Sequence, residues 1–386
     1  MGKLNFDNIL TLAERESGVR GLASDGLRTR VAAMISWIND RGPFDSTQLR
    51  EMQAQIVRLL ANRLRVALDR KRYSAIADEV IERPVFIIGF PRSGTTLLHS
   101  LLTEDPAVLS LKSWHIYSPS PPPGAGPVVR ERIAFAQRAV EAWMDFCPAQ
   151  KSMHPYIDKG AMQLIEDEEL AALDFRTVYP YHFYKVPVLD GMPTPTGDPV
   201  EGFHFHREVL QHLQWQTGKR RWICKGPSHQ MHLAALLKVY PDALCVWAHR
   251  PLSETYASNV ALRAAVFDTI CGRPIDWSQQ ARAHAEAMKA AVDRLMESDL
   301  IDDPLVLHLS FRDIARDPLG AVRQVYEPQG LALDAGAERQ MRGWLADPEN
   351  ASDRYGRYPY SYEAFGLDKD WIEDLFADYS KRFGLA

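Results

Sequence analysis

The chain lacks the features that usually mark a metal-binding, membrane-spanning or nucleic-acid-binding protein. It has four cysteines among 386 residues, and no two of them stand at the CxxC spacing common in zinc sites. No apolar run approaches the about 18 residues of a membrane span, and no signal peptide is recognisable at the N-terminus. The formal net charge of -5 offers no broad basic surface for nucleic acid. These absences predict a reduced, cytoplasmic protein with no metal, no nucleic-acid partner and no stable membrane anchor.

Two patterns divide the chain. Residues from about 4 to 80 carry apolar side chains at helical spacing, which predicts a helical N-terminal region over residues 1–80. From Pro84 onward, short apolar runs alternate with helical patterns. The runs of strand length cover residues 84–90, 108–112, 222–225, 243–248 and 305–309. This alternation predicts an α/β domain over residues 81–386, with a P-loop-like central parallel sheet of about five strands flanked by helices.

The most informative segment is GFPRSGTT, residues 89–96, which leaves a buried strand and enters a helix. Glycines let the backbone approach an anion closely, and backbone N–H groups at a helix start point toward it. The spacing is similar to the phosphate loop GxxxxGK[ST], but Thr95 stands in place of the lysine and the cation lies inside the loop as Arg92. The segment therefore predicts a site for a phosphate-like group.

A magnesium ligand is missing from the expected place. In nucleotide triphosphatases a neighbouring strand ends at an aspartate that helps to hold Mg²⁺. Here the strand over residues 243–248 runs into His249 and Arg250. Together with the missing lysine, this counts against ATP or GTP hydrolysis.

These motifs resemble the sulfotransferases that use 3′-phosphoadenosine 5′-phosphosulfate (PAPS). FPRSGTT is similar to the 5′-phosphosulfate loop of that family, YPKSGTT, with Arg92 replacing its lysine. The 3′-phosphate site of the family has an arginine at a strand end and a serine eight residues later, which Arg250 and Ser258 match. The segments KGPSH (225–229), SFRD (310–313) and YEAFGL (362–367) are similar to the bacterial branch that carries an N-terminal helical region. The resemblance covers residues 84–385 and, loosely, the N-terminal helices.

The resemblance implies an enzyme that moves the sulfonyl group of PAPS to a hydroxyl of a small molecule, lipid or sugar by in-line displacement. As in phosphoryl transfer, such a protein mainly positions the reactants and neutralises developing charge. Arg92 and Lys225 are expected to act at the reacting centre. The residues expected to bind the donor are Pro91, Arg92, Ser93, Gly94, Thr95, Thr96, Arg250, Ser258, Phe311 beside the adenine, and Arg357 or Arg354 near the 3′-phosphate.

Two histidines are candidates for the general base. Many cytosolic sulfotransferases carry a histidine two residues after the active-site lysine. Here that position is Pro227, and His229 lies two residues further on. The bacterial branch usually has a glutamate after the tryptophan that stands here at Trp114, and His115 replaces it. Because a neutral imidazole is suited to proton abstraction near pH 7, we favour His115 over His229.

Two other classes of function stay open, a P-loop small-molecule kinase and a non-catalytic nucleotide-binding protein. No recognisable motif identifies the acceptor or the oligomeric state.

Residues 128–218 are expected to form a helical insertion that shapes the acceptor pocket, and the acidic run Glu166–Glu169 within it is interpreted as a solvated helix start. His99 is interpreted as a packing residue. The following aromatic and methionine residues either line an apolar pocket or belong to the core: Trp143, Met144, Phe146, Met153, Tyr156, Met162 and Tyr184.

Overall fold

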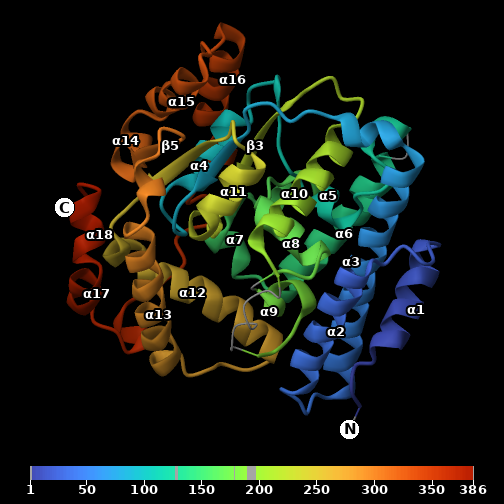
Figure 1. Cartoon of the computed structure of the whole chain (residues 1–386). Helices are drawn as coiled ribbons and strands as arrows, with labels where there is room; N and C mark the ends of the chain where they lie inside the picture. Colours follow the sequence, from blue (N-terminus) through green and yellow to red (C-terminus); the bar gives the residue numbers. More distant parts are fainter. Residues whose placement is uncertain (1, 127–128, 178, 189–196, 386) are drawn as a thin grey trace.

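A five-stranded parallel sheet lies at the centre of the protein, in a computed structural model that describes residues 2–126, 129–177, 179–188 and 197–385 (Figure 1). The spatial order of the strands is β2-β3-β1-β4-β5, and every neighbouring pair is parallel. The five predicted strands are confirmed, although β2 is shorter than expected. The strands are β1 (Val85–Ile88), β2 (Val108–Leu109), β3 (Arg221–Lys225), β4 (Leu244–His249) and β5 (Val306–Ser310).

Both faces of the sheet are covered, which explains why its central strands are mainly apolar. All residues of β1 and β4 are buried. Successive side chains of a strand point to opposite faces, so Phe86 and Ile88 join one hydrophobic cluster while Val85 and Ile87 join another. The second cluster is closed by α4 (Thr95–Leu102), α15 (Pro318–Tyr326) and α16 (Ala335–Ala346).

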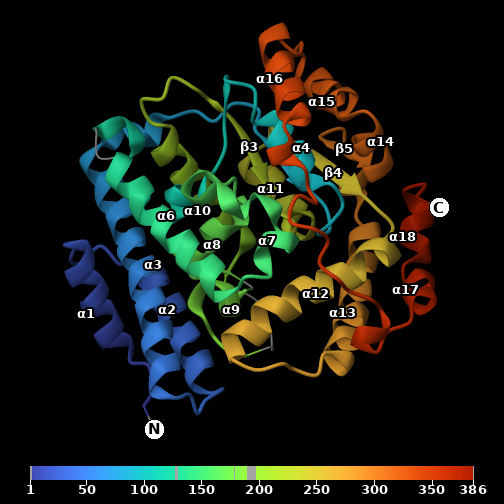
Figure 2. The ribbon, with the colours of Figure 1, turned by 180° about the vertical axis from the view of Figure 1, so that it is seen from behind.

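The N-terminal region is helical, as predicted, and packs against the rest of the chain. Its helices are α1 (Phe6–Ser17), α2 (Asp25–Asn39) and α3 (Ser46–Arg72). Helix α3 begins at a capping box, in which Asp45 accepts from the backbone N–H of Gln48 and the Gln48 side chain accepts from that of Asp45. Apolar side chains of all three helices belong to the same hydrophobic cluster as Phe86 and Trp222 of the sheet. Figure 2 shows the three helices side by side at one flank of the molecule, away from α17 (Lys369–Leu375) and α18 (Ala377–Arg382).

The remaining helices connect or follow the strands along the chain. Short helix α5 (Ser113–Tyr117) follows β2, and α14 (Phe311–Arg316) follows β5. The described part of the 128–218 region is mainly helical, as predicted, with α6 (Val129–Phe146), α7 (Gln150–Met153), α8 (Leu170–Leu173), α9 (Pro180–Tyr184) and α10 (Pro199–Gln214). Helices α11 (Leu233–Val239), α12 (Leu252–Cys271) and α13 (Ser278–Met296) complete the second half. Among the described helices, none combines the length and apolar character needed to cross a bilayer.

Candidate active site

The segment 89–94 forms a tight loop between β1 and α4. Gly94 has a φ of 92°, and a Cβ built there would lie 2.8 Å from the ring of Phe311. Gly89 has a φ of 136°, and a Cβ there would lie 2.5 Å from the carbonyl oxygen of Ala248. Because these φ values are costly for residues with a Cβ, glycine is needed at both turns. The loop thereby holds the start of α4 close to the end of β1, as an anion cradle requires.

Polar side chains from three adjacent strands meet at one edge of the sheet. Lys225 ends β3 beside Ile87 of β1, and Arg250 directly follows β4. The loop carrying Arg92 follows β1, which lies between those two strands. Parallel strands present their carboxyl ends at the same edge, where open α/β sheets bind ligands. The strand order therefore brings together Arg92, Lys225 and Arg250, which are far apart in the sequence.

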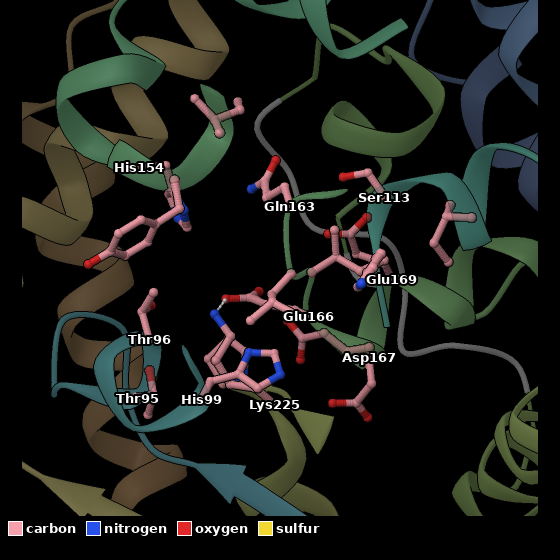
Figure 3. A pocket seen from close by; sticks show the side chains of 18 of the residues that line it. Thr95, Thr96, His99, Ser113, His154, Gln163, Glu166, Asp167, Glu169 and Lys225 are labelled. Carbon is pink, nitrogen blue, oxygen red and sulfur yellow. Dashed lines mark hydrogen bonds and ion pairs between the residues drawn. The ribbon is translucent and has the colours of Figure 1, made fainter. Parts of the chain in front are cut away.

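Lys225 pairs with a carboxylate that the sequence interpretation overlooked. Its Nζ lies 2.9 Å from Oε1 of Glu166, and Figure 3 shows this contact across the cavity from Thr95 and Thr96. The lysine side chain is almost fully buried, whereas that of Glu166 remains 31% exposed. A carboxylate beside the cationic centre and still open to the cavity is positioned to accept a proton.

The acidic run Glu166–Glu169 is not a solvated helix start, which corrects the expectation from its charge. Its residues are buried or half-buried and all four line the same cavity. Burial, reinforced by the neighbouring Glu166, raises the pKa of Glu168 to about 7 and that of Glu169 to about 8. Nothing in the local sequence distinguishes a solvated acidic run from this arrangement, because only tertiary packing brings Lys225 to it.

His229, one of the two predicted bases, is held by a buried ion pair. Its Nε2 lies 2.5 Å from Oδ2 of Asp167, and Nε2 of His206 lies 3.0 Å from the same oxygen. Burial disfavours the charged imidazole, but the Asp167 carboxylate outweighs it and raises the pKa of His229. A histidine held toward its protonated form is a poor base. Asp167 and His206 also lie near Cys224, with ligand atoms within 4.8 Å of one another.

His115, the preferred base, lines the cavity from α5 but is constrained by its own helix. Its Nδ1 accepts a hydrogen bond from the backbone N–H of Lys112 at 3.1 Å. The neutral ring therefore carries its proton on Nε2 and has no free acceptor nitrogen. Burial, together with the charge of Lys112, also lowers the pKa of His115 to about 3. This geometry favours Glu166 over His115 as the base.

Two further histidines lie near Lys225 (Figure 3). His99, expected to be a packing residue, is buried on α4 and its Nε2 lies 2.7 Å from the hydroxyl of Ser110. His154, which the sequence interpretation missed, lines the cavity, and burial and then the charge of Lys225 lower its pKa to about 4. His154 lacks a sequence motif that identifies it, because it follows a short helix and reaches the site only through packing.

The expected donor-binding residues line the same cavity, with the exception of Ser93 and Arg354. The Arg250 guanidinium stacks on the ring of Phe311 at 4.3 Å and donates to the carbonyl oxygen of Arg92 at 3.3 Å. Ser258, on α12, is buried and lines the cavity. Of the two C-terminal arginines, Arg357 is exposed and lines the cavity, whereas Arg354 forms an ion pair with Asp158 at 2.5 Å. The geometry therefore favours Arg357 as the ligand of an additional phosphate.

The cavity has room for two molecules. Its volume is about 2940 Å³, several times larger than the roughly 300–1,000 Å³ of a typical small-molecule site. Trp143, Phe146, Met153, Tyr156 and Met162 line it, whereas Tyr184 is fully buried and donates to the carbonyl oxygen of Ala172. The cavity thus joins a cationic, loop-bounded part to an aromatic part.

A phosphate-type loop after a parallel strand, cations at the ends of three adjacent strands and a partly aromatic cavity define a P-loop-like group transferase. A sequence profile described as the sulfotransferase family matches residues 84–335, more than half of the 386 residues. The chain therefore belongs to the sulfotransferase family, and it is an enzyme that transfers a sulfonyl group from a donor to an acceptor.

Known proteins similar to this chain carry the same activity in their names. Omega-hydroxy-beta-dihydromenaquinone-9 sulfotransferase Stf3 of Mycobacterium bovis is 23% identical over 329 residues, which are 77% of this chain and 76% of that protein. The crystal structure of sulfotransferase STF9 from Mycobacterium avium has a TM-score of 0.79 and 26% identity, over 98% of this chain and 97% of that chain. The structure of STF1 from Mycobacterium tuberculosis H37Rv has a TM-score of 0.77 at 23% identity, over 97% and 99% of the chains, and supports the fold.

Proposed function

We propose that this sulfotransferase uses PAPS as its donor and sulfonates a hydroxyl group of an apolar or aromatic small molecule. The observation that carries the proposal is the meeting of Arg92, Lys225 and Arg250 at one sheet edge beside a glycine-bounded loop. PAPS carries anionic groups at both ends of its ribose, and the loop and the Arg250–Ser258 pair supply two separate cationic or hydroxyl-bearing sites. The aromatic part of the cavity supplies the space for the acceptor.

Features of the loop fit a bound phosphosulfate group. The hydroxyl of Ser93 is buried and has no hydrogen-bond partner among the described residues. A phosphate oxygen accepts such a donor and removes the cost of leaving it unpaired. Because Gly94 has no Cβ, the ring of Phe311 can lie against the loop, and Thr95 and Thr96 place two hydroxyls at the first turn of α4. Arg92, whose Nη1 donates to the carbonyl oxygen of Met153, brings the charge of the loop toward the acceptor side.

The roles of the reacting groups follow from their contacts. Glu166 takes the proton of the acceptor hydroxyl, because its carboxylate is open to the cavity and lies beside Lys225. Lys225 and Arg92 neutralise the negative charge that grows on the leaving phosphate oxygen. Phe311, with one face against Arg250, offers an aromatic surface for the adenine. No step in this scheme requires a metal ion.

A labelling experiment tests the donor and the acceptor class together. The protein is incubated with sulfur-35-labelled PAPS and a metabolite extract, with and without EDTA, and labelled products are identified by mass spectrometry. We expect labelled sulfate esters in both conditions and none with Lys225→Met. Transfer of phosphate from labelled ATP, dependent on Mg²⁺ and without any sulfate ester, would instead support the kinase alternative.

A further inference from the structure

Two basic side chains line the aromatic part of the cavity, at Arg58 on α3 and at Lys185 just after α9. Lys185 and the cations of the proposed reacting centre lie near different histidines of the cavity wall. After burial, the charges of Lys225 and Arg92 contribute to lowering the pKa of His154, whereas the charge of Lys185 contributes to lowering the pKa of His182. All of these side chains and Arg58 line the cavity, and Trp143 lies beside both His182 and Lys185.

Within the described part of the chain, neither cation forms an ion pair. Lys185 has its Nζ 3.4 Å from the centre of the Trp143 ring and forms no hydrogen bond or ion pair with any residue in the described ranges. Arg58 donates through Nε and Nη2 to Oε1 of Gln55, but its Nη1 is buried and finds no acceptor among the described residues. A buried donor without an acceptor destabilises the protein unless a ligand satisfies it.

The surroundings of the two cations are aromatic. Trp143 packs against Phe146, with ring centroids 5.9 Å apart, and against the edge of His182 at 5.7 Å. Burial, with a smaller contribution from the charge of Arg58, lowers the pKa of Lys185 to about 7. An anion binds more strongly there because the walls have low polarity and two positive charges are adjacent.

We propose that the acceptor carries a carboxylate in addition to its hydroxyl, and that Arg58 and Lys185 bind this carboxylate at the aromatic end of the cavity. The proposal rests on the proposed function of the site. The planar guanidinium of Arg58 suits a carboxylate, and the flexible ammonium of Lys185 adds a second donor. The hydroxyl of such an acceptor then points toward Glu166. This arrangement gives the N-terminal helices a part in acceptor selection, because α3 carries Arg58.

Binding by calorimetry tests this proposal independently of turnover. The probes are para-hydroxyphenyl alkanoates of increasing chain length and their primary amides, added to the full-length protein saturated with 3′-phosphoadenosine 5′-phosphate. For at least one chain length we expect the acid to bind roughly tenfold or more tightly than its amide, the worth of a charged hydrogen bond. Lys185→Met and Arg58→Gln should reduce this ratio strongly, and Lys185→Arg should largely retain it.

Matched controls separate a charge effect from damage to the fold. Lys71→Met and Arg50→Gln remove exposed cations from the same helix α3 and should leave the ratio of acid to amide affinity unchanged. Equal binding of acids and amides at every chain length, or an unchanged ratio in Lys185→Met, would overturn the proposal. If acids bind preferentially but none is sulfonated by PAPS, the proposed function fails while the carboxylate site stands.

The pH dependence gives an independent readout. The neighbours of Lys185 are Arg58 and Glu51 on α3, Cys147 after α6 and His182 on α9. Because the pKa of Lys185 is lowered to about 7, its positive charge is present below that pH and is lost above it. The preference for the acid should therefore weaken between about pH 6 and pH 9, without vanishing because Arg58 stays charged. In Lys185→Arg the preference should be flat over this range, and the same slope in that variant would contradict the role of Lys185.

Discussion

At the scale of single residues, the assignment of the base depends on which side chain has a free acceptor atom. The Nδ1 of His115 is occupied by the backbone N–H of Lys112, and His229 is paired with Asp167. The carboxylate of Glu166 pairs with Lys225 through Oε1 and remains partly exposed to the cavity. Charge and sequence motif had favoured histidine, but hydrogen-bond geometry favours the carboxylate.

Replacing the carboxylate of Glu166 tests this assignment. Glu166→Gln keeps the shape but removes the proton acceptor, so kcat should fall by roughly 10²–10⁴-fold, the usual contribution of a positioned general base. The affinity for 3′-phosphoadenosine 5′-phosphate, measured by calorimetry, should change little because Glu166 faces the acceptor. His115→Ala is the comparison. If His115→Ala loses activity while Glu166→Gln turns over normally, the base is His115, as the sequence had suggested.

At the scale of elements, the strand–loop–helix unit from β1 to α4 depends on glycine where the backbone turns. A Cβ at residue 94 meets the ring of Phe311, which in turn lies under Arg250. Displacement of the loop therefore also disturbs the aromatic ring and the arginine that are expected to hold the nucleotide. The loop between β1 and α4, Phe311 of α14 and Arg250 after β4 are therefore coupled through direct contacts.

Gly94→Ala tests the coupling between loop geometry and nucleotide binding. The positive φ by itself should cost about 1–2 kcal/mol of unfolding free energy. The contact with Phe311 should in addition weaken binding of 3′-phosphoadenosine 5′-phosphate by roughly tenfold or more, because charged hydrogen bonds to the loop are lost. Gly218→Ala is the matched control, since Gly218 also has a positive φ, of 75°, but open space around its Cβ position. It should lower stability in chemical denaturation without affecting nucleotide affinity, and similar affinities for both variants would disprove the coupling.

At the scale of the whole molecule, the central sheet and its surrounding helices place the loop after β1, the Arg250–Ser258 pair and the aromatic side chains around one cavity. The division into residues 1–80 and 81–386 remains a proposal. Side chains of both parts share one hydrophobic cluster, and α3 contributes Arg58 and Leu59 to the cavity wall. We therefore propose that the N-terminal region is an integral wall of the acceptor site.

The two proposed anion sites predict discrimination between nucleotides. The protein should bind 3′-phosphoadenosine 5′-phosphate more tightly than 5′-AMP by about 1.5–3 kcal/mol per charged hydrogen bond to the 3′-phosphate. Arg250→Gln should remove most of this difference in calorimetry. Arg316→Gln, which alters an exposed arginine of α14, should not. Equal affinity of the unaltered protein for both nucleotides would show that Arg250 and Ser258 do not form a 3′-phosphate site.

The sequence by itself determined the features that depend on neighbouring residues. Buried strands need apolar runs, an anion loop needs glycine and hydroxyl residues at fixed spacing, and Arg250, just after β4, precedes Ser258 of α12 by eight positions. The five strands were predictable for this reason, and so were the loop at residues 89–96 and the family resemblance. The roles of Arg92, Lys225, Arg250, Ser258 and Phe311 stay predictions, but the residues do lie around one cavity.

Tertiary structure alone decided which side chains face one another across that cavity. The contact between Glu166 and Lys225 joins residues 59 positions apart, and no local pattern distinguishes it from a solvated acidic run. The buried Nη1 of Arg58 and the position of Lys185 over Trp143 likewise depend on packing between separate elements. Sequence spacing encodes contacts along an element, whereas the reactivity of a site depends on desolvation and partners that distant elements supply.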